Sequence, residues 1–476
     1  MTVHFGSNGK PLANLVMSIA SYTQAKSIVE YSESPLYNYQ YSSIGKLFAR
    51  LLEAVDNDPK QFSAQVRDFI RPYIPCEPTI RTQLDCFPVY KPLSCTHPER
   101  SAVYKPNVKV EGQKPVEIGY NISSLNQGFP EKWSIPHSME RVSTSKTSLQ
   151  VGIEQIQAFI KTLPADDSLM VNTSDSSYGN AQFLCTLHQE QNLVNITRFK
   201  NRNVYEHSPK KGTGGANRIY GQAYNLAKIG SISRRKNPKT KELAIPKPSI
   251  ETKQADETSS YLSRTNKGRS IKVVLKMYRN MMIRSKNKFS MKDKPFDLVI
   301  VEHLDADTLE PIHNKPIYLA VSGQRKGLVS LDDAYRTHYS HRWDIEPNNR
   351  FIKHQLLLDK FQSPIQAHFE LWLSVIQLVE WLLFIASKEV ENTPKKWQQY
   401  DPKNKTDDQS ILTITQTRKS CAPFFLTFEK SAFLPKISKK GKGRKKGTKL
   451  TPKATHKPVR KQKSTKKPVE ECQKNE

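Results

Sequence analysis

Apolar positions change their spacing several times along the chain, and each change predicts a different kind of element. From residue 22 to residue 73 they recur at helical spacing, as in IGKLFARLLEAV and FSAQVRDFI. Between residues 79 and 119 they form short β-like runs separated by turn residues, in TIRTQLDCFPVY, SAVYKPNVKV and PVEIGYNI. The pattern therefore predicts a helical N-terminal region over residues 1–75 that is followed by several adjacent strands.

Strands and helices then alternate up to about residue 200. The runs SLQVGIEQIQAFIKTL and GNAQFLCTLHQEQ have helical spacing, whereas SLMVNTSD and NLVNITRF are apolar enough for buried strands. Alternation of this kind is typical of an α/β fold, in which helices cover the faces of a sheet. We therefore expect residues 76–200 to form the first part of a mixed α/β core.

The alternation breaks after residue 200. A Gly-rich turn, KKGTGGANRIYG, and a polar stretch over 234–258 precede three β-like runs, SIKVVLKMY, FDLVIVEHL and PIYLAVSG. This pattern predicts a mostly β insertion over 201–325. Helical spacing returns over 326–395, where LWLSVIQLVEWLLFIA is shorter than the roughly 20 residues that a bilayer requires and contains Gln377 and Glu380, so we expect a buried helix. A C-terminal extension, 396–435, follows.

The net charge of the chain indicates what kind of partner the protein binds. The chain has 74 Lys and Arg against 45 Asp and Glu, a net charge of +29, which favours a polyanion and first of all nucleic acid. Residues 436–476 carry 16 Lys and Arg against three acids and almost nothing apolar, so we expect a disordered basic tail. The first residues lack the pattern of a signal peptide, and the six cysteines form no CxxC pair, which together predict a cytoplasmic protein with reduced thiols and no membrane partner.

The segment HYSHRWDIEPNNRFIKHQ carries the sharpest candidate chemistry. Asp344 can cap a helix that places Glu346 in its first turn and Pro347 at its third position, where no backbone donor is needed. Glu346, Arg350 and Lys353 then share one face, so that a carboxylate able to hold a metal lies beside cations able to hold phosphate. The alternative is a solvated charged helix face, which the pattern alone favours.

A resemblance adds to this interpretation. The spacing Tyr-x2-Arg-x3-Glu-x6-Lys, filled by Tyr339, Arg342, Glu346 and Lys353, resembles the C-terminal signature of bacterial insertion-sequence transposases of the DDE type. Trp343 and Ile345 also stand where members of that family often have Trp and Ile. The resemblance implies that Glu346 is a metal ligand and a catalytic residue. It also implies a DNA-binding surface made of Tyr339, Arg342, Trp343, Arg350 and Lys353.

Two aspartates stand upstream in settings that match the family. Asp175 ends an apolar strand and has a Tyr three residues later, as the family's second aspartate does, although a carboxylate there could also cap the next helix. Asp85 lies inside a predicted strand and is the only aspartate between Asp68 and Asp166. A bound metal would explain an acid in an apolar strand, and the alternative is that the strand turns Asp85 to solvent.

The resemblance spans residues 80–390 and implies a ribonuclease-H-like mixed sheet with flanking helices, interrupted by the β-rich insertion. It implies two Mg²⁺ or Mn²⁺ ions per active site, held by Asp85, Asp175 and Glu346, because hard oxygen ligands suit these ions. The implied reaction is cleavage of a phosphodiester at each transposon end, followed by joining of the freed 3′ ends to target DNA. The implied partners are the double-stranded terminal repeats, the target DNA and a second copy of the chain, at the bacterial nucleoid.

The chain departs from the family at three points, one of which is its long basic tail. Phe87 stands where the family commonly has a threonine, and no Trp occurs between Trp133 and Trp343. Stacking on a displaced base would then fall to one of four aromatic side chains, namely Tyr261, Tyr278, Tyr318 or Trp343. Two alternatives stay open: a DNA-binding protein without catalysis, and a metal-dependent nuclease that does not join strands. The sequence leaves open the DNA ends recognised, the region that reads them, the preferred target, a hairpin intermediate and whether the chain is active.

Overall fold

The computed structural model of the protein describes residues 1–75, 77–106, 115–163, 168–207, 219–227, 247–265, 268–285, 287–393, 411–428, 431–432, 447 and 453–460. Its strands are β1 (Thr79–Tyr90), β2 (Ser101–Tyr104), β3 (Val116–Gly128), β4 (Ser134–Arg141), β5 (Leu169–Ser174), β6 (Leu193–Phe199), β7 (Asn203–Glu206), β8 (Ala223–Asn225), β9 (Glu257–Arg264), β10 (Ser270–Met282), β11 (Phe296–Asp305) and β12 (Ile317–Ser322). The α-helices are α1 (Thr2–Phe5), α2 (Gly9–Ser21), α3 (Ser42–Glu53), α4 (Pro59–Ile70), α5 (Ser148–Ile160), α6 (Ala181–Leu187), α7 (Ile345–His354), α8 (Gln366–Ala386) and α9 (Ile414–Leu426).

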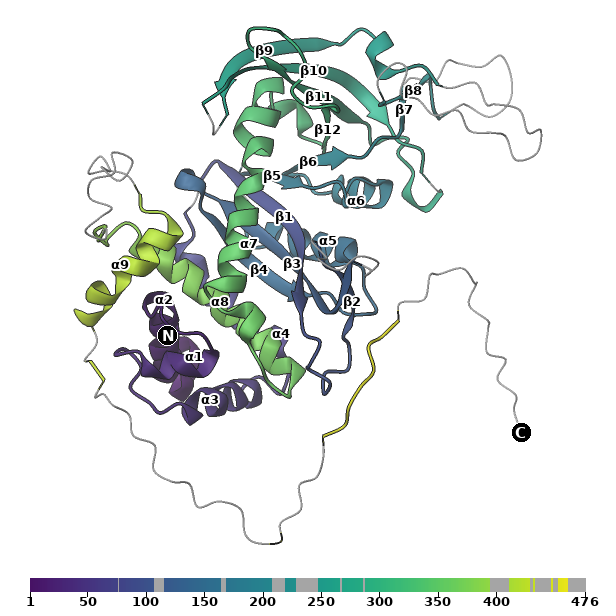
Figure 1. Ribbon diagram of the computed structural model, residues 1–476. Helices are drawn as coiled ribbons and strands as arrows, with labels where there is room; N and C mark the ends of the chain where they lie inside the picture. Colours follow the sequence, from purple (N-terminus) through teal and green to yellow (C-terminus); the bar gives the residue numbers. More distant parts are fainter. Residues whose placement is uncertain are drawn as a thin grey trace, which may run out of the picture.

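These strands join into a single sheet of twelve (Figure 1), in the order β2-β3-β1-β5-β6-β12-β11-β10-β7-β8, with β4 paired to β3 and β9 paired to β10. The strands β1, β5 and β6 are parallel, whereas β3 is antiparallel to β1 and β4 is antiparallel to β3. The expected mixed α/β fold is confirmed. The expected strands and helices between residues 79 and 199 are also present, but β4 was not expected.

The β-rich segment of the sequence does not form a sheet of its own. Its strand β12 pairs antiparallel with β6 through five residue pairs from Tyr318↔Phe199 to Ser322↔Asn195. Through β12 the strands β11, β10 and β9 continue the sheet that begins with β1 (Figure 1). The two halves of the sheet therefore share one hydrogen-bonded framework.

The two faces of the sheet are covered by different helices. One face packs against α5 and α6 through an apolar cluster that includes Ile80, Leu84 and Met170. The other face packs against α8 and the N-terminal helices through Phe87, Val89 and their neighbours. Because successive side chains of a strand point to opposite faces, Asp85 shares the second face with Phe87 and Val89.

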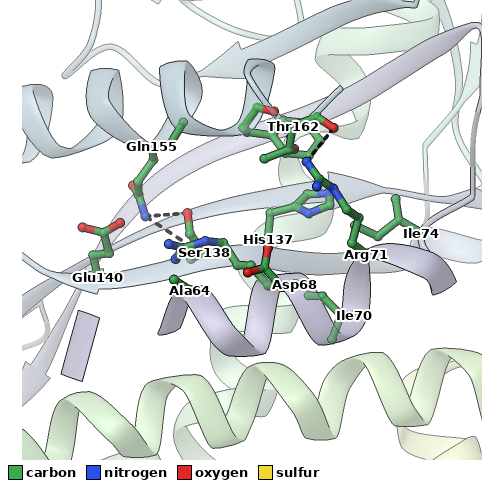
Figure 2. A pocket seen from close by; sticks show the side chains of 13 residues that line it. Ala64, Asp68, Ile70, Arg71, Ile74, His137, Ser138, Glu140, Gln155 and Thr162 are labelled. Carbon is green, nitrogen blue, oxygen red and sulfur yellow. Dashed lines mark hydrogen bonds between the residues drawn. The ribbon is translucent and has the colours of Figure 1, made fainter. Parts of the chain in front are cut away.

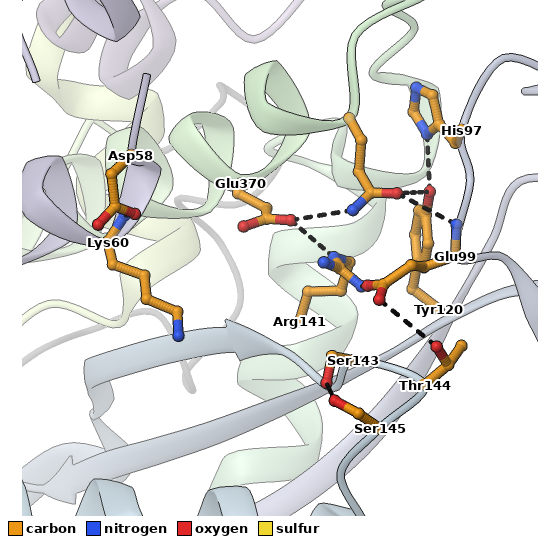
Figure 3. A network of polar contacts seen from close by, with 11 residues as sticks. Asp58, Lys60, His97, Glu99, Tyr120, Arg141, Ser143, Thr144, Ser145 and Glu370 are labelled. Atoms are coloured by element: carbon orange, nitrogen blue, oxygen red, sulfur yellow. Dashed lines mark hydrogen bonds and ion pairs between the residues drawn. The ribbon is translucent and has the colours of Figure 1, made fainter. Parts of the chain in front are cut away.

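The apolar helix α8 is the core of that second layer. Within the described residues it is the one helix that is long and apolar enough to cross a membrane, and 83% of its most apolar stretch is buried inside the protein. Figure 3 shows how the N-terminal part of α8 is fixed to the sheet: Arg141 of β4 donates to Glu370 of α8 (2.7 Å) and also pairs with Glu99. The expected buried helix is thus confirmed.

The basic tail is only partly described. Residues 453–460 lie beside the loop before β2, where the backbone N–H of His456 donates to the carbonyl of Cys95 (2.8 Å) and that of Val459 donates to the carbonyl of Arg100 (2.6 Å). For these eight residues the expectation of disorder is wrong, because backbone hydrogen bonds hold them against the protein. Almost all of the rest of the tail lies outside the described residues, so its expected disorder is not tested. Most of the Gly-rich turn and most of the polar stretch over 234–258 also lie outside the described residues.

Candidate active site

Two of the three predicted carboxylates lie on neighbouring strands. The parallel pairing of β1 with β5 places Leu84 opposite Ser174, so the next residues, Asp85 and Asp175, project side by side from the same face. The carboxylate of Asp175 lies just beyond the end of β5 and accepts hydrogen bonds from the backbone N–H (2.8 Å) and hydroxyl (2.5 Å) of Ser177. Asp85 and Asp175, which are 90 positions apart in the sequence, are thus neighbours on the same face of the sheet.

A polar ladder behind these strands fixes their relative register. On the face opposite Asp85, the hydroxyl of Thr82 donates to the side-chain oxygen of Asn172 (3.2 Å), and the amide of Asn172 donates to Asn195 (3.0 Å). All three side chains are buried. Because a shift by one residue would break every bond of this ladder and bury polar groups without partners, the ladder holds Asp85 and Asp175 in line.

Glu346 approaches the same face from α7. It lies in the first turn of the helix, and its carboxylate accepts a hydrogen bond from the buried guanidinium of Arg342 at 2.9 Å. Asp344 occupies the N-cap position as expected, but its side chain makes no capping hydrogen bond and instead pairs with the Nδ1 of His341 at 3.0 Å. The expectation that the Asp344 carboxylate caps α7 is therefore wrong.

The charges of the three carboxylates act on one another. Burial raises the pKa of Asp85 above its usual value of 3.8, and the negative charges of Asp175 and Glu346 raise it further, whereas the positive charge of Arg342 lowers it. A carboxylate of raised pKa near two others is a site where a cation would be stabilised. The three side chains supply the hard oxygen atoms that Mg²⁺ and Mn²⁺ prefer, so the donor set fits such ions.

The carboxylates are nevertheless not gathered around one point. Among the described residues, no group of three or more His, Cys, Asp or Glu side chains converges closely enough to hold a metal ion. Half of the Glu346 side chain is exposed, and Arg342 is its ion-pair partner. Glu346 would have to turn from Arg342 toward Asp85 to share a metal with it.

One residue of the site was missed by sequence reasoning. Asn349, three residues after Glu346 on the same face of α7, donates its side-chain amide to the carboxylate of Asp85 at 3.1 Å. Its side chain is buried, and its amide oxygen has no hydrogen-bond partner among the described residues. The spacing of three residues from Glu346 was the available signal, because residues three apart on a helix share a face.

The predicted phosphate-binding residues fall into two groups. Arg350 is exposed, and Lys353 lies at 4.8 Å from the centre of the Phe87 ring, where burial lowers its pKa and the charges of Asp359 and Asp85 raise it. Tyr339 and Arg342, in contrast, are 0% and 4% exposed. In this conformation Tyr339 is a packing residue below Arg342 and does not present its hydroxyl to solvent.

The predicted stacking residues differ in the same way. Tyr278 and Tyr318 are 2% and 7% exposed because they lie in the apolar layer between the sheet and α5 and α6. They are therefore unable to stack on a base in this conformation, and their prediction as stacking residues is not supported. Tyr261 is half-buried beneath Arg336. Trp343 is 41% exposed and packs on Arg342, whose guanidinium carbon lies 4.0 Å from the ring centre, so a stacking surface exists beside Glu346.

A cavity of about 240 Å³ lies between α4, β4 and α5, away from these carboxylates (Figure 2). It is lined by Glu140 and His137 of β4, and Arg71 crosses one end to donate to the carbonyl of Thr162 at 3.1 Å. Burial raises the pKa of Glu140, and it lowers the pKa of His137 to about 3. None of the predicted site residues lines this cavity.

Comparison with known protein families and with curated proteins gives no match. The arrangement of Asp85, Asp175 and Glu346, together with the signature that ends in Lys353, is therefore the ground on which a function is proposed.

Proposed function

We propose that this protein is a metal-dependent DNA transposase that binds insertion-sequence ends, cleaves phosphodiester bonds and joins the 3′ ends to target DNA. The observation that carries the proposal is the position of Asp85 beside Asp175 on two parallel strands, with Glu346 approaching from α7. The charges of Asp175 and Glu346, which come from distant parts of the sequence, act on Asp85, and the signature residue Arg342 contacts Glu346.

The order of five of the first six strands supports a ribonuclease-H-like core, and the sixth, the short strand β2, pairs with β3. Three antiparallel strands, β4, β3 and β1, are followed by the parallel strands β5 and β6, and helices cover both faces. The position of Asp85 on β1 and of Asp175 just beyond the end of its parallel neighbour β5 supports the mixed sheet that the resemblance implies. Fold by itself assigns no function, so the proposal depends on the carboxylates.

Asp85, Asp175 and Glu346 would hold two Mg²⁺ or Mn²⁺ ions. When bound, such ions activate the attacking oxygen and stabilise the leaving one in phosphoryl transfer. Within the chain, Asn349 orients the Asp85 carboxylate, and Arg342 holds Glu346 until it is drawn toward the site. Lys353 and Arg350 supply positive charge for phosphates beside the cleaved bond, and Trp343 offers a face for stacking.

The proposed partners follow from the same chemistry. The net charge of +29 suits double-stranded DNA, and cutting both ends of an element calls for two active sites, hence for a homodimer in the complex with the ends. We propose a cytoplasmic, nucleoid-associated location on the same grounds. Buried packing of α8 is consistent with a protein that does not span a membrane.

The decisive experiment compares the intact protein with Glu346→Gln on supercoiled plasmid that carries the element's flanking repeats. Nicking and joining are followed on gels with Mn²⁺ or Mg²⁺, and DNA binding is measured in parallel. Glu53→Gln is the matched control, because Glu53 lies exposed on α3, far from the carboxylates.

We expect Glu346→Gln to bind DNA normally and to lose nicking and joining, while Glu53→Gln retains both. Equal activity in all three proteins would remove Glu346 from the mechanism. Cleavage without joining would favour a metal-dependent nuclease instead, and DNA binding without cleavage by the intact protein would favour a DNA-binding protein without catalysis.

A further inference from the structure

A groove of about 430 Å³ runs along the side of α7 that faces away from Asp85. Three segments line it: the turn before β4, with Lys132 and Trp133; the helix α7, with Pro347, Arg350 and His354; and the start of α9, with Thr413, Ile414 and Thr415. Adjacent residues of an α-helix lie about 100° apart around its axis. The groove therefore adjoins the face of Glu346 without containing it, and Arg350 borders both.

The lining of the groove is positively charged. It includes Lys132, Arg350 and His354 and contains no Asp or Glu. The Nδ1 of His354 lies 3.8 Å from the carboxylate of Asp359. Lys132 and Arg350 are both exposed, and neither side chain forms an ion pair with another described residue. Two cations without an ion-pair partner among the described residues thus line a hollow that the buried apolar side chains of Trp133 and Phe351 also line.

The position of Lys132 is built into a tight turn. The turn η4 (Pro130–Lys132) links β3 to β4, and the backbone N–H of Phe129 donates to the carbonyl of Trp133 at 2.8 Å across it. Lys132 has a φ of 61°, in the left-handed region that side chains other than glycine rarely adopt. Such strained residues cluster at functional sites, and this turn holds the lysine at the rim of the groove.

The opposite wall is the first turn of α9, a helix of 13 residues. A capping box closes this end: Thr413 N–H donates to the Gln416 side chain, and Gln416 N–H donates to the Thr413 hydroxyl. The N–H groups of Ile414 and Thr415, which lie between them, carry partial positive charge that adds to that of Lys132 and Arg350. The helix is held in place by Arg418, whose buried guanidinium donates to the carbonyls of Ile19 (3.1 Å) and Tyr22 (3.2 Å). The C-terminal extension thereby contributes a fixed wall beside the catalytic helix.

We propose that this groove binds the phosphodiester backbone of DNA that continues from the cleaved bond. The proposal rests on the proposed function, because it assigns to that site the path of its substrate beyond Glu346. Charge complementarity identifies the occupant: a strand passing over Arg350 would place its next phosphates between Lys132 and the first turn of α9. Apolar sugar edges would lie over Trp133 and Phe351.

Binding can be separated from catalysis by carrying out the test in Glu346→Gln protein without metal. Affinity for a blunt duplex of about 40 base pairs is measured over a series of NaCl concentrations. The slope of log affinity against log salt concentration is proportional to the number of phosphates that the protein contacts. The groove variants are Lys132→Glu and Thr415→Glu. The control is Lys46→Glu, which reverses an exposed charge on α3 outside the groove.

We expect each groove variant to bind about tenfold more weakly, and Lys132→Glu to lower the slope of the salt dependence by about 1. Lys46→Glu should stay within about twofold of the parent. Thermal melting of each variant verifies that it is folded. If the groove variants bind as tightly as Lys46→Glu, the groove does not bind DNA, and the proposed function is left intact. If the parent Glu346→Gln protein itself fails to bind the duplex, both proposals are overturned.

Discussion

The two halves of the sheet are stabilised in different ways. The strands that carry Asp85 and Asp175 bury a polar ladder, Thr82, Asn172 and Asn195, in which each side chain bonds to the next. The strands β11 and β12 of the β-rich half instead face their neighbours with aliphatic side chains, such as Val299, Leu319 and Val321. The hydrogen bonds of a polar ladder form in only one register of the strands. The packing of an aliphatic layer tolerates substitutions as long as the total side-chain volume is kept. The difference indicates that register is controlled where the carboxylates must align.

The sharpest separation of stability from function is expected at Asp85. Asp85→Asn should lower metal-dependent nicking about a thousandfold or more, because it removes a charged metal ligand, an effect of about 4 kcal/mol. The same variant should melt no lower than the wild type at pH 7 without metal. In the wild type, burial raises the pKa of Asp85 in the folded state. The charged form of Asp85 therefore reduces the stability of the fold once the pH exceeds the usual pKa of 3.8.

Asp307→Asn, an exposed change in the β-rich half, is the control for both measurements. Differential scanning fluorimetry and plasmid nicking give the two readouts. Retained nicking in Asp85→Asn would exclude Asp85 as a ligand, and a large loss of melting temperature would show that its charge stabilises the fold.

In the aliphatic half we expect the reverse result. Leu319→Ala should reduce the free energy of unfolding by about 2–5 kcal/mol, because it leaves a cavity in a fully buried layer. Nicking per folded molecule at low temperature should stay within about twofold. Leu319→Met, which conserves volume, should cost less than about 1.5 kcal/mol. Urea unfolding measures the stabilities, and a matching loss of activity per folded molecule would mean that the two halves are not energetically separate.

A third variant tests the ladder. Asn172→Ala should cost about 1–3 kcal/mol because it leaves Thr82 and Asn195 with buried polar atoms that have lost a partner. It should also lower nicking per folded molecule, since the ladder aligns the strands that bear the carboxylates. Asn203→Ala removes a similar amide pair, that of Asn225 with Asn203 at 3.2 Å, which is exposed. Equal unfolding costs for the two changes would argue against a special role for the buried ladder.

The smallest effect concerns Asn349 and pH. Its amide hydrogen bond favours the charged form of Asp85, so Asn349→Ala should raise the Mn²⁺ concentration needed for half-saturation by about tenfold. Protons compete with the metal for Asp85, so the affinity of both proteins should fall as the pH falls toward the raised pKa of that group. The fall should begin at a higher pH in Asn349→Ala. Calorimetric titration with Mn²⁺ from pH 5 to 8 tests this, and identical curves would exclude the positioning role.

Local periodicity was sufficient to predict most of the regular elements. The runs that became β1, β5 and β6 and the helix α5 have the spacing that buried strands and an amphipathic helix require. The strand β4 was not predicted, because its sequence SIPHSMER is polar although six of its residues are buried. His137 tolerates burial there by pairing with Gln127, a contact with a residue ten positions away that a pattern does not reveal.

The candidate site was predictable where the chemistry resides in one segment and less so where it depends on pairing. Glu346 and Lys353 were identified because one short segment resembles the family signature, whereas its charge pattern alone favoured a solvated helix face. The bond from Asn349 to Asp85 joins residues 264 positions apart, and the pairing of β12 with β6 joins Tyr318 to Phe199. Tyr339 and Arg342 were expected to contact DNA, but both are buried in the 3-10 turn η9 (Tyr339–Asp344), which follows the π-helical turn η8 (Asp333–His338).

The hydrogen-bonded join between β6 and β12 has a mechanical consequence. Five consecutive residue pairs cross it, so the two halves of the sheet cannot turn about a flexible hinge without breaking a row of backbone bonds. A double helix that docks across both halves would have to adjust its own curvature to theirs. Sequences that bend or open easily would then be bound more tightly, even at base pairs that no side chain touches.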